Sequence, residues 1–195
     1  AVNGLRKAFI NSDRIRHEEI TPFLISNIDR MNSEILERGR REPEIAGMGT
    51  TLNCLMFVGD KLHLAHVGDS RTYMYYKKHL YQLTFDHSVA NFVEKGWISR
   101  QAIQAGAREG ALVKAIGLGD RCDVDLYEVK LKPGQLFITC SDGLSEMIED
   151  RQLAHLLSEA GEDYAQLPQR LIDAANAAGG KDNITVLVSC VVSNS

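Results

Sequence analysis

The sequence has few cysteines and no paired ones. Cys54, Cys122, Cys140 and Cys190 lie far apart, with no CxxC spacing, so neither a zinc ribbon nor a disulfide framework is indicated. Three of them stand inside apolar runs, a position that favours buried structural thiols over reactive ones. We therefore expect a reducing, cytoplasmic setting.

The sequence also lacks a strong charge bias and a long apolar run. A formal net charge of -4 over 195 residues excludes a general basic field, so neither nucleic acid nor a membrane is expected as a partner. No run approaches the roughly 18 to 20 apolar residues of a spanning helix. With 44% apolar residues, residues 1–195 can bury one sizeable core, and we expect a single domain.

Several common site motifs are missing as well. GMGTTL (47–52) leads into a strand, unlike a dinucleotide loop, and no glycine precedes Lys181 at the phosphate-loop spacing. Ser141 is not surrounded by a G-x-S-x-G elbow. His63 and His66 are three residues apart, which on a strand sends them to opposite faces, so we do not expect them to share a zinc ion.

The apolar pattern predicts antiparallel strands interrupted by helices, which indicates an α+β sandwich of antiparallel sheets. Helices are expected at about 2–9 and 21–40, hairpins around 59–60 and 77–78, a helical excursion at 88–116, and further strands near 125–131, 135–140 and 183–192. Ser99 and Asp150 are candidate helix caps. The last strand reads as buried on both faces.

Three aspartates share one setting, at an end of an apolar strand. Asp69 follows LHLAHVG, Asp142 follows LFITCS, and Asp182 precedes NITVLVSCVV. If these strands are neighbours, the carboxylates can meet at one rim of a sheet and suit a hard cation such as Mg²⁺ or Mn²⁺. We expect Gly143 to let the chain turn sharply beside that ion. The alternative is that each aspartate only completes a turn, and His87 is likewise either a base or a hydrogen-bonded turn residue.

The order of short motifs resembles that of the metal-dependent protein phosphatases, the type 2C serine/threonine phosphatases or PPM family. The resemblance covers about residues 1–192 and is closest to the compact bacterial members. It rests on GMGTT (47–51), AHVGDSRTY (65–73), QLTFDHS (82–88), ITCSDGLSEMI (138–148) and GGKDNITVLV (179–188).

The resemblance implies a β-sandwich of two antiparallel sheets flanked by helices, with a centre for two Mg²⁺ or Mn²⁺ ions. Asp142 and Asp182 match its metal ligands, and Asp69 matches the aspartate that joins Asp142 at a third, weaker metal site. Residues 88–116 correspond to the flap beside the active site. The implied reaction is hydrolysis of phosphoserine and phosphothreonine in proteins by a metal-activated water. A phosphorylated protein is then the substrate, and a cognate Ser/Thr kinase or its targets are candidate partners.

Other motifs of the family do not occur in these 195 residues. They are an arginine that grips phosphate, an Asn-Glu-Asp motif, and Asp-Gly-Met-Gly-Gly-His, which supplies the bridging aspartate and the proposed general acid. We expect a parent protein to carry them, with the missing first strands of the sandwich, upstream of Ala1, and we expect residues 1–195 alone to be inactive. No catalytic residue is assigned within them. The alternative function is a non-catalytic, phosphatase-like module that binds a phosphoprotein or another partner without turning it over.

Overall fold

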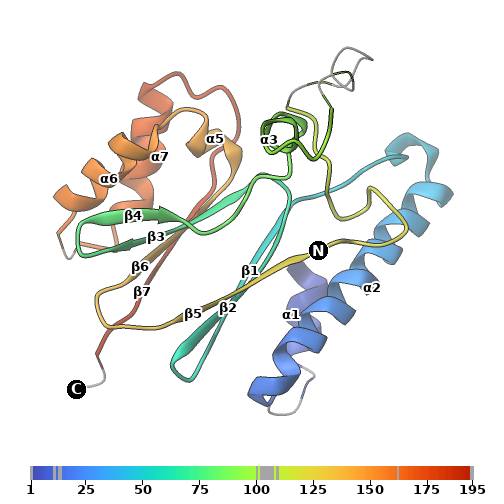
Figure 1. Cartoon of the computed structure of the whole chain (residues 1–195), viewed down its shortest axis with the longest axis horizontal. Helices are drawn as coiled ribbons and strands as arrows, with labels where there is room; N and C mark the ends of the chain where they lie inside the picture. The colour runs from blue at the N-terminus through green and yellow to red at the C-terminus, as the bar shows by residue number, and fades with distance from the viewer. Residues whose placement is uncertain are drawn as a thin grey trace. The chain divides into compact units, whose positions relative to one another are not determined.

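A computed structural model of the chain contains two compact units, each with its own antiparallel sheet (Figure 1). The first unit comprises residues 1–68 and 86–129, and the second comprises 69–85 and 130–195. Helices flank both sheets, which confirms the predicted class of two antiparallel sheets with flanking helices. The single domain remains a prediction. The structure describes residues 2–10, 12, 15–99, 101, 108, 110–161 and 163–193.

The first unit packs a long helix against a three-stranded sheet of order β1-β2-β5. Ile20, Leu24, Ile28 and Met31 recur at helical spacing along α2 and are almost fully buried, as an amphipathic helix requires. Gly59 takes a positive φ of 59° in the predicted hairpin. The elements are α1 (Val2–Ile10), η1 (His17–Glu19), α2 (Ile20–Arg41), η2 (Pro43–Ile45), β1 (Leu52–Val58), β2 (Lys61–Val67), α3 (Val89–Glu94) and β5 (Asp125–Lys130).

The helical excursion begins with α3. The Ser88 hydroxyl accepts a hydrogen bond from the Asn91 backbone N–H at 3.3 Å, which caps this helix. Gly96 follows the helix with a φ of 73°. The next helix, expected after Ser99, falls largely on residues 100, 102–107 and 109, which lie outside the described residues, as does this part of the predicted flap.

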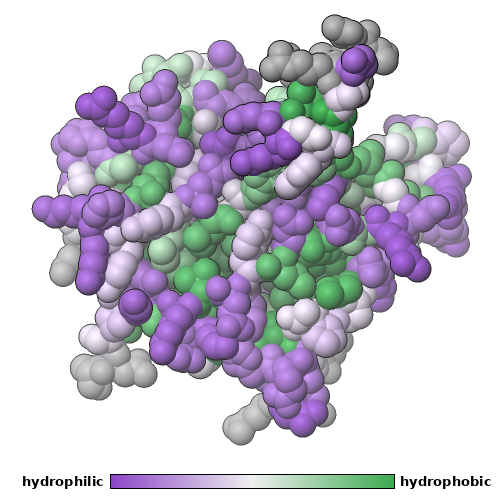
Figure 2. Space-filling view, in the orientation of Figure 1, coloured by the Kyte–Doolittle hydropathy of each residue, from purple (hydrophilic) through white to green (hydrophobic). Residues whose placement is uncertain are grey.

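The second unit has a four-stranded sheet of order β4-β3-β6-β7, with three helices grouped beside it (Figure 1). Lys77 and Lys78 take positive φ values of 50° and 65° in the predicted second hairpin. Figure 2 shows mainly hydrophilic side chains over the outer surface of α6 and α7. The elements are β3 (Arg71–Tyr76), β4 (His79–Gln82), β6 (Leu136–Cys140), α5 (Asp142–Ser145), α6 (Asp150–Glu159), α7 (Leu167–Ala177) and β7 (Val186–Cys190).

Two local predictions are wrong. β7 is not buried on both faces, because its alternate residues Val186 and Val188 pack against the core whereas Leu187 between them is 56% exposed. An apolar run does not report how many faces of a strand are covered. Asp150 is the first helical residue of α6, and Glu149 occupies the cap position without a side-chain cap bond. None of the helices in the described part of the chain has the length and apolar character needed to cross a bilayer.

Candidate functional site

The three predicted aspartates lie beyond the same end of the four-stranded sheet. In the antiparallel pairing, Arg71 of β3 is opposite Cys140 of β6, which in turn is opposite Val186 of β7. Asp69 shortly precedes β3, Asp142 shortly follows β6, and Asp182 shortly precedes β7. Because adjacent antiparallel strands run in opposite directions, these three positions share one rim. The predicted gathering of the segments is therefore present.

Hydrogen bonds join the segment that carries Asp142 to the one that carries Asp182. The Ser141 backbone N–H donates to the Thr185 carbonyl at 3.1 Å. The Ser141 hydroxyl donates to the Asn183 carbonyl at 3.1 Å and accepts from the Thr185 N–H at 3.0 Å. Ser141 thus uses its backbone and its side chain to hold the two aspartate-bearing turns together.

Gly143 lets the two turns approach closely. A Cβ at this position would collide with the Asn183 carbonyl oxygen and lie 3.1 Å from the carbonyl carbon. Gly143 is the second residue of α5, and its φ is not in the left-handed region. The expectation that this glycine permits a sharp turn is therefore wrong. Its lack of a side chain matters because a backbone carbonyl occupies the space.

The carboxylates of Asp142 and Asp182 each complete a local backbone bond. Asp142 Oδ1 accepts from the Gly143 N–H at 2.9 Å, and Asp182 Oδ1 accepts from the Asn183 N–H at 2.6 Å. Within the described part of the chain, neither aspartate pairs with a Lys, Arg or His. Asp142 is half-buried and Asp182 is exposed. Each keeps oxygen lone pairs for a hard cation, so this donor set fits Mg²⁺ or Mn²⁺.

The structure does not bring the three side chains themselves to ligand spacing. Over the described residues, the oxygens of Asp69, Asp142 and Asp182 do not all lie within 4.8 Å of one another. The backbone therefore gathers the three positions, while their role as ligands remains a prediction.

His87 holds the residue directly before Asp69. Its backbone N–H donates to the Gly68 carbonyl at 2.8 Å, and the Gly68 N–H donates to His87 Nδ1 at 3.0 Å. Burial lowers the pKa of His87. Its Nε2 lies 3.1 Å from Asp125 Oδ2, and this carboxylate offsets part of the effect of burial on the pKa of His87. His87 is hydrogen-bonded, as one interpretation expected, but it does not lie in a turn; its role as a base stays a prediction.

The thiols match the prediction of a disulfide-free chain. All four cysteines are free. Cys122 and Cys140 are buried, whereas Cys54 and Cys190 are half-buried. Burial raises the pKa of Cys54 and of Cys122 to about 11, which keeps both thiols protonated and unreactive near neutral pH.

The comparisons with known proteins point to one family. The sequence model of the family "Protein phosphatase 2C" matches residues 11–110. The serine/threonine phosphatase stp of Listeria monocytogenes is 33% identical over 172 residues, which cover 88% of this chain and 68% of that protein. The serine/threonine protein phosphatase PstP of Mycobacterium tuberculosis is 34% identical over 162 residues, covering 83% of this chain and 31% of PstP.

Solved structures agree with the sequence comparisons. The Streptococcus agalactiae serine/threonine phosphatase superposes with a TM-score of 0.86 at 31% identity, covering 97% of this chain and 78% of that one. The catalytic domain of PstP, solved in complex with two manganese ions, superposes with a TM-score of 0.80 at 29% identity. The superposition covers 98% of this chain and 80% of the PstP chain. This chain therefore belongs to the protein phosphatase 2C family, as its motif order predicts.

Proposed function

We propose that this protein is a metal-dependent phosphatase that hydrolyses phosphoserine and phosphothreonine in proteins. The observation that carries the proposal is the junction in which Ser141 bonds the turn of Asp142 to the loop of Asp182. Each aspartate accepts one local backbone N–H, and the junction joins the two segments that carry these carboxylates, each with lone pairs left for a hard cation. Family membership and the two manganese ions of the related PstP catalytic domain support the same reading.

Asp142 and Asp182 are the proposed metal ligands, and Asp69 is proposed to join Asp142 at a third, weaker metal site. Their oxygens favour Mn²⁺ or Mg²⁺ over softer ions. When bound, such ions acidify a water, orient a phosphate oxygen and offset the charge that develops at phosphorus. The protein's own part is to keep the two turns in register through Ser141 and the close approach at Gly143.

The partners and setting follow from the same proposal. The substrate is a phosphorylated protein, and a cognate Ser/Thr kinase or its targets are the proposed partners. The free, high-pKa thiols of Cys54 and Cys122 support a reducing, cytoplasmic location.

The test is Mn²⁺-dependent phosphate release from a phosphothreonine peptide by the full-length protein. Asp142→Asn keeps the side-chain shape and the acceptor for the Gly143 N–H but removes the charge. We expect it to lower activity at least about 100-fold, because metal stabilisation of a transition state contributes several kcal/mol. Asp173→Asn is the matched control, since Asp173 is exposed on α7 and only accepts a bond from Gln169.

The outcomes separate the two functional hypotheses. Full activity in Asp142→Asn would overturn the assignment of Asp142 as a metal ligand. If the unaltered protein binds the phosphopeptide but releases no phosphate at any Mn²⁺ concentration, the non-catalytic binding module is supported instead. Equal losses in Asp142→Asn and Asp173→Asn would mean that charge alone, and not position, matters.

A further inference from the structure

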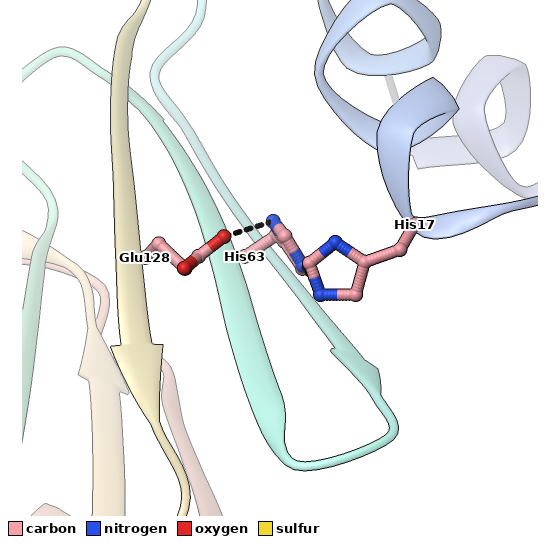
Figure 3. Close-up of side chains that lie close together, drawn as sticks. All are labelled: His17, His63 and Glu128. Carbon is pink, nitrogen blue, oxygen red and sulfur yellow. Dashed lines mark hydrogen bonds and ion pairs between the residues drawn. The ribbon is translucent and has the colours of Figure 1, made fainter.

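A second set of potential metal ligands lies in the first unit. Over the described residues, His17, His63 and Glu128 are the one group of three His, Cys, Asp or Glu side chains whose ligand atoms all lie within 4.8 Å of one another. They come from η1, β2 and β5 (Figure 3). None of the three belongs to the carboxylate rim near Asp142. The cluster therefore requires its own explanation.

The spacing of the two imidazoles fits a shared metal ion as well as it fits a hydrogen bond. His17 Nε2 and His63 Nε2 are 3.3 Å apart, the length of a long hydrogen bond in which one of the two neutral rings donates. Two nitrogens bound at about 2.05 Å to one tetrahedral ion stand about 3.3 Å apart. The 3.3 Å separation equals that of two imidazoles on one tetrahedral ion.

A carboxylate oxygen of Glu128 lies within 4.8 Å of a ring nitrogen of each histidine (Figure 3). Its Oε2 is 3.9 Å from His63 Nδ1, and its Oε1 pairs with Lys61 Nζ at 2.5 Å. At 3.9 Å this contact is longer than a hydrogen bond, but the negative charge of the carboxylate favours the tautomer of His63 with the proton on Nδ1. The lone pair of His63 Nε2 is then directed at His17. In metal-bound histidines the other ring nitrogen donates to a carboxylate, and Glu128, which is exposed, can move to hydrogen-bond distance of Nδ1.

One histidine of the cluster is buried, whereas the other histidine and the glutamate are exposed. The His63 side chain is 8% exposed, so its ring is fixed among neighbours, whereas Glu128 is 48% exposed. His17 is also exposed. The two exposed residues can adjust to an ion without repacking the core, and water can reach the remaining coordination positions.

We propose that His17 and His63 bind one divalent transition-metal ion through their Nε2 atoms, with Glu128 as the positioning residue that orients His63. Zinc is the ion that imidazole donors and tetrahedral spacing suit best. Such a site discriminates against Mg²⁺ and Mn²⁺, which prefer oxygen ligands. A bound ion would link η1, at the start of α2, to the β1-β2-β5 sheet. This inference does not depend on the proposed phosphatase activity.

The test uses Co²⁺ as a spectroscopic substitute for Zn²⁺ in the full-length protein without a polyhistidine tag. Excess Mg²⁺ is present throughout to fill oxygen-ligand sites. Tetrahedral Co²⁺ with nitrogen ligands absorbs strongly in the visible range, whereas octahedral Co²⁺ with oxygen ligands absorbs weakly. We expect a strong band that saturates at one equivalent of Co²⁺ and disappears on addition of Zn²⁺.

Three variants assign the band. His17→Ala should abolish it, and Glu128→Gln should weaken Co²⁺ binding about 10- to 100-fold, as the loss of a carboxylate behind a ligating histidine does. His155→Ala is the matched control, because His155 pairs with Glu159 on α6 at 3.4 Å and, over the described residues, belongs to no group of three potential metal ligands. Its band should equal that of the unaltered protein.

A second readout is independent of spectroscopy. Zn²⁺ should raise the midpoint of thermal unfolding of the unaltered protein and of His155→Ala but not of His17→Ala, because only a folded site binds the ion. Absence of a strong Co²⁺ band, or the same band in His17→Ala, would overturn the site. Unchanged affinity in Glu128→Gln would remove Glu128 from it.

Discussion

The sharpest consequence of the structure concerns Gly143, where a single added methyl group should separate the two aspartate-bearing turns. In Gly143→Ala the new Cβ meets the Asn183 carbonyl oxygen, which must retreat by roughly 0.6 Å to reach the shortest distance that real Cβ contacts show. The obstacle is backbone and cannot rotate away. The displaced segment carries Asp182 directly before Asn183.

Two measurable effects follow from that displacement. Overpacking of this kind costs about 1–3 kcal/mol of folding free energy, and the 3.1 Å bond from the Ser141 hydroxyl to the Asn183 carbonyl lengthens with it. Because Asp182 moves relative to Asp142, Mn²⁺ affinity should fall about 10- to 100-fold, as for other losses of support around metal ligands.

The assay combines urea unfolding with a Mn²⁺ titration of phosphatase activity. Gly119→Ala is the matched control, since a Cβ there would meet only the Arg121 carbonyl oxygen at 3.7 Å, an ordinary contact. It should change the free energy of unfolding by less than about 0.5 kcal/mol. If Gly143→Ala matches Gly119→Ala in both stability and Mn²⁺ affinity, the argument from close approach at Gly143 is refuted.

Two further predictions concern the first unit. Burial lowers the pKa of His87, so the folded state gives up this proton more readily than the unfolded chain, and stability is lost as the pH falls below about 6.5. His87→Gln should lose less stability between pH 7 and pH 5 than the unaltered protein in urea unfolding, and an equal loss would contradict this. Asn32 is fully buried, donates to the Gly119 carbonyl at 2.7 Å and accepts from the Gly117 N–H at 2.6 Å. Asn32→Ala should therefore cost about 2–4 kcal/mol in the same assay, whereas Asn27→Ala on the same helix should cost under 1 kcal/mol, and equal costs would count against the role of these buried bonds.

The elements could be predicted from local patterns because the forces that form them are local. The helical spacing of Leu24, Ile28 and Met31 and the turn chemistry at Gly59 need only neighbouring residues, and the structure has the predicted helix and hairpin there. What could not be predicted is the choice of sheet partners. β5 and β6 are separated by a short Pro-Gly turn, yet β5 joins β1 and β2 whereas β6 joins β3 and β7.

The same division holds for the two sites. Asp69, Asp142 and Asp182 could be proposed together because all three share one setting at the end of an apolar strand, although a single aspartate there is an ordinary turn residue. His17, His63 and Glu128 carry no shared motif. Only the pairing within the β1-β2-β5 sheet and the position of η1 place them within 4.8 Å.

The sequence alone determined where most helices and strands lie, the order of the family motifs, and the presence of carboxylates at one end of the four-stranded sheet. These properties depend on residue spacing and side-chain chemistry, which are encoded residue by residue. Only the tertiary structure decided that Ser141 binds the loop of Asp182 and that Gly143 is small because Asn183 lies against it. Only it placed His17 beside His63. These contacts join residues distant in the chain, and such contacts arise when the core packs and selects which segments meet.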